Sequence, residues 1–395
     1  MAAPTASRTQ DTDFAGITIA VACGLIVTFT ALYLCVIPFD RSLSVSRDYV
    51  FYWAAGQQVV HHLNPWDPAM VSQVEHAAGF KAQGSYYMRN PPWGLILAWP
   101  LGLLPALAGA LPWSLMMLAA AWLSARLGWS TLGQPGNHVQ WLAFAFPPAL
   151  QCVVMGQTSV FPLLGLVLFL RLHRSRPFWA GASLWFCMLK PHLFVPWALV
   201  LFAWIAVTRT WRILAGGAVA MAASGLVTEA LDPQAWSQYL QWARASGVSS
   251  QYIPCLSVEL RNHLTPGREW LAFAPVAVAS VWALAWFWPR RHTWDWMGDG
   301  NLLILVSLVA APYCWFSDQS VAMPAILAAA ACTRSRRILG ALGLLYLVML
   351  IQPYAFSVGV TSPLFLWTAP GWLAWYLWAR ASTGRAAPAT AASPA

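Results

Sequence analysis

Long apolar segments, separated by short polar or basic stretches, run through almost the whole chain. A membrane helix needs about 20 apolar residues, or fewer where it is short or buried in a bundle. The pattern therefore predicts an all-α polytopic membrane protein with about twelve spans. These spans cover roughly residues 14–37, 106–127, 138–151, 158–171, 177–190, 192–207, 211–229, 268–288, 300–312, 319–333, 337–353 and 363–379.

One further apolar stretch, residues 92–105, is too short and too rich in proline for an ordinary span. It follows Pro91 and contains Pro100 and Pro105. Proline lacks the backbone donor that a helix interior requires. We therefore expect 92–105 to be a re-entrant or interfacial helix that enters and leaves on the same side.

The basic residues support this interpretation of 92–105. If that stretch spanned fully and the N-terminus lay inside, Arg126 and the cluster at 171–176 would fall outside. If it is re-entrant, the basic clusters fall on the inner side, as the positive-inside rule expects. These clusters are Arg171–Arg176, Arg209–Arg212, Arg290–His292, Arg334–Arg337, and Arg380 with Arg385. Both termini are then predicted to lie inside.

This orientation predicts one transmembrane domain, residues 14–380, between an inner tail at 1–13 and a disordered inner tail at 381–395. The first apolar run is too long for a signal peptide, so we expect an uncleaved span. Two large outer loops follow, at 38–92 and 230–267. A loop as long as 38–92 is usually functional, and we expect helices of its own within it. In the second loop an amphipathic helix is expected on the membrane interface.

Composition agrees with a membrane protein and narrows the partners. The chain is 59% hydrophobic and 9% charged, whereas soluble domains carry about 25% charged residues. The net charge of +9 lies in the clusters between spans, so it indicates contact with the lipid bilayer and no nucleic acid. The seven Cys contain no C-x-x-C, which disfavours a zinc site or a thiol redox motif. Free thiols are favoured, although Cys152, Cys255 and Cys314 on the outer side leave a disulfide open.

Asp48 is the first candidate for chemistry. It lies in the first outer loop, and four of the next five residues are aromatic, including Tyr52. Desolvation by such neighbours raises the pKa of a carboxyl group and makes it a better general base. Spacing alone favours a different role, since an aspartate that opens a helix is commonly its N-cap.

Lys190 is a cation between two apolar stretches, beside Pro191 and His192. A charge at the membrane edge is costly and usually has a partner. A lipid phosphate is a natural partner on the outer side, and snorkelling toward the headgroups is the alternative. Arg89 is similar, because it can clamp a phosphate or simply anchor at the interface.

The remaining outer polar residues are ambiguous one by one. Gln157 can bind sugar hydroxyls or a neighbouring helix. Asp67 lies in Asn64-Pro65-Trp66-Asp67-Pro68. Asn-Pro and Asp-Pro both mark turns, so turn chemistry is favoured over a role in orienting the loop. Arg261 and Asp318 belong to the later outer segments. With Tyr52, these residues are our candidates for sugar or acceptor binding.

Several nucleotide and hydrolase motifs are missing from the sequence. There is no Walker loop, G-x-G-x-x-G, H-E-x-x-H or G-x-S-x-G. The one D-x-D, Asp11-Thr12-Asp13, is predicted to lie in the inner tail. A metal-bound nucleotide-sugar site is therefore not supported, and we predict no metal ligands and no cofactor.

A series of short motifs runs in order from about residue 45 to residue 330. They are Asp48 with Phe51-Tyr52 and Ala54-Ala55-Gly56; Asn64-Pro65-Trp66-Asp67; Asn90-Pro91-Pro92 with Pro100-Leu101 and Leu104-Pro105; Gly156-Gln157; Leu189-Lys190-Pro191; and Ala311-Pro312-Tyr313 with Trp315. In order and spacing they resemble glycosyltransferase family 87, polytopic mannosyltransferases of the GT-C structural class.

The resemblance implies a sugar, mannose in the family, transferred from a polyprenyl-phosphate donor on the outer leaflet to a glycolipid or glycan acceptor. At the matching positions, Asp48 would deprotonate the acceptor hydroxyl and Lys190 would stabilise the leaving phosphate, with inversion at the anomeric carbon. Arg89 and His192 are added as donor-phosphate residues by our own reading of the sequence. The location implied is a bacterial inner membrane with the site facing the periplasm.

Two alternatives from other classes remain. A transporter or flippase of lipid-linked glycans would favour ionisable residues at mid-membrane, whereas this chain keeps its charges near the ends of spans. A non-catalytic relative that binds glycolipid is the second. The stretches at 253–261 and 314–318 depart from the family pattern, which leaves the acceptor and the identity of the sugar open.

Overall fold

The computed structural model describes residues 6–36, 39–40, 47–81, 88–133, 138–246, 252–264, 268–333, 335–356 and 359–384, and every regular element within these ranges is helical. The α-helices are α1 (Ala6–Val36), α3 (Tyr49–Val60), α4 (Pro68–Ala78), α5 (Leu95–Gly102), α6 (Ala106–Thr131), α7 (Trp141–Phe144), α8 (Pro147–Met155), α9 (Val160–Leu172), α10 (Pro177–Ser183), α11 (Val195–Thr208), α12 (Trp211–Leu231), α13 (Ala235–Ser246), α14 (Leu256–Glu259), α15 (Ala274–Phe287), α16 (Asp299–Ala310), α17 (Met323–Cys332), α18 (Arg336–Ala355) and α19 (Thr368–Gly384). Short 3₁₀-helices include η2 (Pro92–Gly94), η4 (Cys187–Leu189), η5 (Pro191–Leu193) and η10 (Phe316–Ala322).

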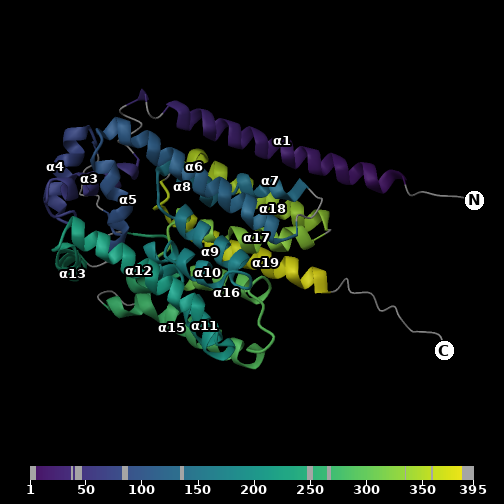
Figure 1. Cartoon of the computed structure of the whole chain (residues 1–395). Helices are drawn as coiled ribbons and strands as arrows, with labels where there is room; N and C mark the ends of the chain where they lie inside the picture. The colour runs from purple at the N-terminus through teal and green to yellow at the C-terminus, as the bar shows by residue number, and fades with distance from the viewer. Residues whose placement is uncertain are drawn as a thin grey trace, which may run out of the picture.

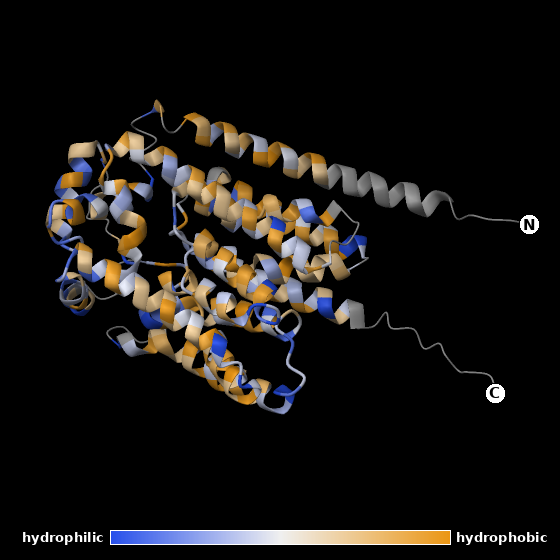
Figure 2. Cartoon of the chain, viewed as in Figure 1, coloured by the Kyte–Doolittle hydropathy of each residue, from blue (hydrophilic) through white to orange (hydrophobic). Residues whose placement is uncertain are grey.

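The long helices lie side by side in one bundle, with the start of α1 and the end of α19 at the same end of the molecule (Figure 1). The short helices α3, α4 and α13 gather at the opposite end. Figure 2 shows that the long helices are mostly hydrophobic, while hydrophilic positions gather toward the two ends of the bundle. This distribution is what a bilayer requires of a helical protein.

Among the described residues, four helices are long and apolar enough to cross a membrane: Ala106–Thr131, Trp211–Leu231, Trp270–Arg290 and Arg336–Pro353. Shorter apolar helices lie beside them, among them Val160–Leu172 and Val195–Thr208. The predicted all-helical membrane protein is therefore confirmed. The number of twelve spans stays a prediction.

The chain ends and the 92–105 stretch differ in detail from the expected boundaries. Helix α1 already begins at Ala6 and α19 continues to Gly384, while residues 1–5 and 385–395 lie outside the described residues. In the 92–105 stretch, the turn η2 leads into α5, which has eight residues. At 1.5 Å per residue α5 is about 12 Å long, much shorter than a bilayer core. The re-entrant path of this stretch stays a prediction.

In α9 and α11, basic residues and the other polar candidates lie at opposite ends of the helix. Gln157 lies just before α9, and Arg171 is in the last turn of that helix. Lys190 lies just before η5 and α11, and Arg209 caps the other end of α11. Arginines and outer-side candidates thus occupy opposite ends of the same helices.

Helix α3 is held in place, at the end of the bundle that it shares with α4 and α13, by close packing on α5. Ten of its twelve residues are buried. A Cβ placed on Gly56 would lie 2.1 Å from the carbonyl oxygen of Ala98, so the two backbones approach as closely as glycine allows. The Trp53 indole also donates to the carbonyl of Leu104 at 2.8 Å. These contacts fix the helix that begins directly after Asp48.

Replacing Gly56 with Ala should destabilise the protein, because the added methyl group overlaps backbone atoms that cannot move independently. Overpacking of this kind typically costs about 1–3 kcal/mol. We expect a lower midpoint of thermal unfolding for the purified protein in detergent. Gly343→Ala is the matched control, since nothing lies within 4 Å of a Cβ there. An equal midpoint for the two variants would contradict the close α3–α5 contact.

Candidate functional site

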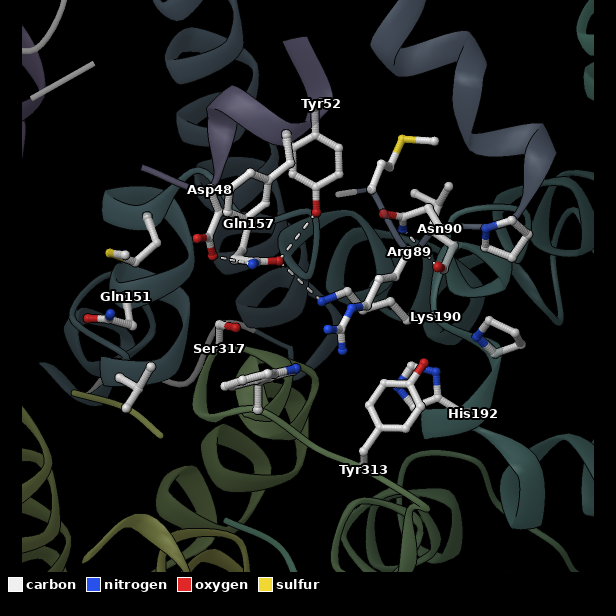
Figure 3. A pocket seen from close by; sticks show the side chains of 18 of the residues that line it. Asp48, Tyr52, Arg89, Asn90, Gln151, Gln157, Lys190, His192, Tyr313 and Ser317 are labelled. Atoms are coloured by element: carbon white, nitrogen blue, oxygen red, sulfur yellow. Dashed lines mark hydrogen bonds between the residues drawn. The ribbon is translucent and has the colours of Figure 1, made fainter. Parts of the chain in front are cut away.

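A cavity of about 360 Å³ opens at the end of the bundle where α3 and α13 lie. It is built from segments that are far apart in the sequence: the start of α3, the stretch before η2, the turn after α8, the η4–η5 turn, α13, and the segments around 313–317 and 360–361. The lining residues include Asp48, Tyr52, Arg89, Gln157, Lys190 and His192, all of which were candidates from sequence, as well as Asn90, Gln151, Tyr239, Tyr313, Trp315 and Ser317 (Figure 3).

Arg47 anchors the backbone next to Asp48. Its side chain is buried and donates to the carbonyl oxygens of Val154 (2.5 Å) and Val153 (2.7 Å), and to the Ser114 hydroxyl at 3.0 Å. The two carbonyls belong to the last turn of α8, where a cation is favoured by the unpaired backbone acceptors. Arg47 therefore ties the backbone before α3 to α8 and sets the position of Asp48.

Asp48 stands at the N-cap position of α3 but does not cap it. Its backbone is already in the helical region, and its side chain accepts no hydrogen bond from the described backbone of that helix. Instead, its carboxylate accepts a hydrogen bond from the Gln157 amide nitrogen. Burial raises the pKa of Asp48, and the hydrogen bond from Gln157 and the charge of Lys190 partly offset this rise. The group is thus a desolvated carboxyl that faces a cavity.

Gln157 connects this carboxylate to a cation. Its amide oxygen accepts from the Tyr52 hydroxyl at 3.3 Å and from the Lys190 ammonium at 3.4 Å. The residue before it, Gly156, has φ of +74° and ends α8 in the left-handed conformation, which favours glycine. A Cβ there would also lie 3.0 Å from that of Tyr49. The glycine therefore lets the chain turn closely beneath α3 and present Gln157 to the cavity (Figure 3).

Lys190 forms a buried ion pair with Asp318. The ammonium lies 2.6 Å from Asp318 Oδ1, and both groups also bond to the Ser159 hydroxyl, at 2.8 Å from Lys190 and 2.6 Å from Asp318. The second carboxylate oxygen accepts from the backbone N–H of Trp315 at 2.9 Å. Burial alone would lower the pKa of Lys190, but Asp318 raises it above its usual value. Burial likewise opposes the charge of Asp318, yet Lys190 holds its pKa below the usual range. Both groups are therefore charged at neutral pH.

Arg89 and Asn90 form the wall of the cavity before η2. Arg89 extends toward the middle of the cavity in Figure 3. Asn90 is buried, and its amide donates to the Leu189 carbonyl at 2.9 Å. This bond joins the stretch before η2 to the turn that carries Lys190, so the two cationic side chains come from segments that are held together.

His192 lines the cavity as a neutral ring. It stacks on Tyr313 with ring centroids 3.7 Å apart. Burial lowers its pKa to about 3, and the nearby charges change this only in part. It can therefore offer a hydrogen bond or a stacking face at neutral pH but no positive charge. A neutral imidazole can still donate one hydrogen bond to a phosphate, so the predicted role of His192 at the donor phosphate stays a prediction.

Three candidates lie outside the described lining of the cavity. Asp67 is the N-cap of α4, where its side chain accepts from the backbone N–H groups of Ala69 (2.9 Å) and Met70 (3.2 Å). This is the turn chemistry that its sequence context favours. Arg261 is buried in the segment after α14. Asp318 lies beneath the cavity and reaches it through Lys190.

Residues that were not chosen from the sequence complete the site. Ser159 bridges Lys190 and Asp318, and Tyr313 carries the stack on His192. The polar run Gln157-Thr158-Ser159 between apolar segments was the available signal for the serine. Nothing in the sequence alone indicated which of these hydroxyls would face Asp318, because the two lie 159 positions apart.

The arrangement offers a desolvated carboxyl group and two cationic side chains around one cavity. A carboxyl group with a raised pKa suits proton abstraction from a hydroxyl, and lysine and arginine suit an anionic group such as phosphate. Among the described residues, no group of three or more His, Cys, Asp or Glu is placed to hold a metal ion.

Comparison with known proteins gives one match. The model of glycosyltransferase family 87 matches residues 87–312 of the chain. No curated protein and no solved structure matches it. The matched region contains Arg89, Gln157, Lys190 and His192, whereas Asp48 precedes it.

Removing one member of the Lys190–Asp318 pair should be worse for stability than removing both. Either Lys190→Met or Asp318→Asn leaves a buried charge unpaired, which typically costs about 3–5 kcal/mol. We expect each single variant to be more destabilised than the double variant, measured as unfolding free energies in detergent. Strict additivity would show that the two charges do not depend on each other.

Proposed function

Because the chain belongs to glycosyltransferase family 87, we propose that it is a membrane enzyme that transfers a sugar from a polyprenyl-phosphate donor to an acceptor hydroxyl. Mannose is the proposed sugar, and a glycolipid or glycan is the proposed acceptor. Asp48 is the proposed general base, and the reaction inverts the anomeric carbon. The cavity described above is the proposed site of transfer.

The observation that carries this proposal is the position of Gln157 between a carboxylate and a cation. Its amide nitrogen bonds to Asp48 and its amide oxygen accepts from Lys190 at 3.4 Å. An inverting transfer needs a base beside the acceptor and positive charge beside the leaving group, with the sugar between them. The carboxamide of Gln157 contacts the candidate base through its nitrogen and the candidate phosphate ligand through its oxygen.

In the proposed reaction, Asp48 takes the proton of the acceptor hydroxyl. The oxygen attacks the anomeric carbon from the face opposite to the phosphate. The bond from that carbon to the phosphate oxygen breaks. The electron pair of this bond stays on the oxygen, and the leaving group is the polyprenyl phosphate. The raised pKa of Asp48 makes its carboxylate a stronger base than a solvated aspartate.

Lys190 and Arg89 are the proposed phosphate ligands. The charge of Lys190 is fixed in place by Asp318 and Ser159 before the donor arrives, so stabilising a leaving phosphate would require little reorganisation. Arg89, from the adjoining segment before η2, supplies a second cation to the same cavity.

Tyr52 and Gln157 are the proposed sugar contacts, because both line the cavity beside Asp48. The stacked rings of His192 and Tyr313 form an apolar wall with polar edges, which suits the ring of a sugar or the start of a prenyl chain. Asp67 and Arg261 are better suited to shaping the loops around the entrance. Asp318 is proposed to act through Lys190, as a positioning residue.

The proposed location is a bacterial inner membrane, with the cavity on the periplasmic side. The support is the separation of charge described above, since the arginine-rich ends of α9 and α11 lie opposite to the cavity. Arginine and lysine favour the cytoplasmic side of a membrane. A lipid-linked donor displayed on the outer leaflet would then reach the cavity from the bilayer.

Replacing Asp48 with Asn should abolish transfer and leave folding intact. Asparagine keeps the shape and can accept the Gln157 hydrogen bond, but it cannot take a proton. We expect a loss of about 10²–10⁴-fold in rate, typical of a missing general base. The measurement is transfer from polyprenyl-phosphate mannose to glycolipid acceptors by the purified protein.

Asp232→Asn is the matched control, because Asp232 ends α12 and lies outside the cavity. Full activity in Asp48→Asn would remove that residue from its proposed role. Transfer from a nucleotide sugar, with none from lipid-linked sugars, would overturn the proposed donor.

Removal of the Gln157 hydrogen bond should change the pH dependence of the reaction. This bond stabilises the carboxylate, so Gln157→Leu raises the pKa of Asp48 further. The base works when deprotonated, so activity falls as the pH drops through this pKa. We therefore expect the acid limb of the pH–rate profile to move to higher pH. In Gln151→Leu, a change in the same cavity without a bond to Asp48, the limb should stay in place. An unmoved limb in Gln157→Leu would contradict the coupling.

A further inference from the structure

Two adjoining cavities lie at the other end of the bundle, far along the helices from the proposed catalytic site. The first, of about 390 Å³, is a mainly apolar groove between α9 and α10. The second, of about 520 Å³, lies at the end of α9 and is lined by arginine and hydroxyl groups. The groove is lined by Leu168, Leu172, Arg176, Trp179, Ala182, Ser183 and Phe186. The second cavity is lined by Thr131, Arg171, Leu172, Ser175 and Arg176. Leu172 and Arg176 line both cavities, so the two lie next to each other.

The groove follows from the way α9 and α10 cross. They touch at Gly165, where a Cβ would lie 2.7 Å from the carbonyl oxygen of Ser183. Toward the loop between the helices, the side chains of Leu168 and Trp179 flank an open space instead. Trp179 is 61% exposed. An apolar channel thus runs along the outside of the bundle and ends at arginines.

The arginines at the end of the groove are not neutralised by carboxylates. Arg174, in the same loop, pairs with Asp295 at 3.0 Å. Among the described residues, no carboxylate forms an ion pair with Arg171 or Arg176. One nitrogen of Arg171 donates to the Ser130 hydroxyl at 2.6 Å, which fixes its guanidinium beside α6. Two positive charges therefore remain for a ligand.

We propose that this site binds an anionic phospholipid, with the phosphate between Arg171 and Arg176 and one acyl chain in the α9–α10 groove. Arginine forms strong paired hydrogen bonds with phosphate. Basic pockets between membrane helices are suited to anionic headgroups. A small soluble anion would use the arginines but leave the apolar groove unexplained, whereas an acyl chain would fill the groove and gain van der Waals contacts along it. Charge and groove together therefore favour a phospholipid.

The test is binding of phosphatidylglycerol to the full chain in detergent, measured by titration in native mass spectrometry with phosphatidylcholine as the neutral comparison. Removing both charges in Arg171→Gln/Arg176→Gln should weaken phosphatidylglycerol binding by about 10- to 30-fold, at about 1 kcal/mol for each basic residue. Arg290→Gln/Arg291→Gln is the matched control. It removes two charges at the same end, from guanidiniums that lie over Trp286 and Trp288, and should leave binding nearly unchanged.

The groove is tested separately by Trp179→Ala, with Trp211→Ala as its control. Both tryptophans are more than half exposed, so neither change removes a core side chain. Only the first should weaken phosphatidylglycerol binding. Equal affinity for the two lipids, or equal losses in the two arginine variants, would overturn the proposal. Displacement of the lipid by inorganic phosphate at equal concentration, with Trp179→Ala unchanged, would reduce the site to a small-anion site. Transfer activity is not a readout, so these results stand apart from the proposed function.

Discussion

The buried contact between Lys190 and Asp318 is the interaction on which the candidate site depends. The two residues are 128 positions apart and their charged atoms meet at 2.6 Å, with almost no solvent around them. Neither charge could be buried alone, because desolvating an ion costs several kcal/mol unless a partner compensates. The pair therefore fixes the turn between α10 and α11 against the start of η10. Ser159 adds the beginning of α9 to the same point.

The rest of the site is built outward from that pair. Lys190 reaches Gln157, Gln157 reaches Asp48, and Arg47 ties Asp48 to the end of α8. Each step joins a different segment, so the cavity is rigid where the charges are. Rigid placement matters for the proposed chemistry, since a base and a phosphate ligand act well only when held in position before the substrate arrives. The lipid site proposed at the other end uses the opposite principle: its arginines keep unneutralised charge for a ligand to satisfy.

Much of the fold was predictable because it follows from local composition. Runs of apolar residues predict membrane helices, and arginine-rich turns predict which ends share a side. The short motifs also indicated glycosyltransferase family 87, which the family model confirmed for residues 87–312. The role of Asp48 was harder to predict, because its place before a helix favoured an N-cap over a general base. The structure instead directs its carboxylate to Gln157, and it is Asp67 that performs the capping expected of an aspartate before a helix.

The sequence by itself determined that this is a helical membrane protein, and it predicts which polar loops share a side and which polar residues lie on the outer side. Those properties depend on hydropathy and charge counted along the chain. Only the tertiary structure decided which of these residues meet. Asp318 proved to be the partner of Lys190 beneath the cavity, and His192 a neutral ring stacked on Tyr313. The reason is physical: charge pairing and burial depend on distances between segments more than a hundred residues apart, and those distances arise only when the helices pack.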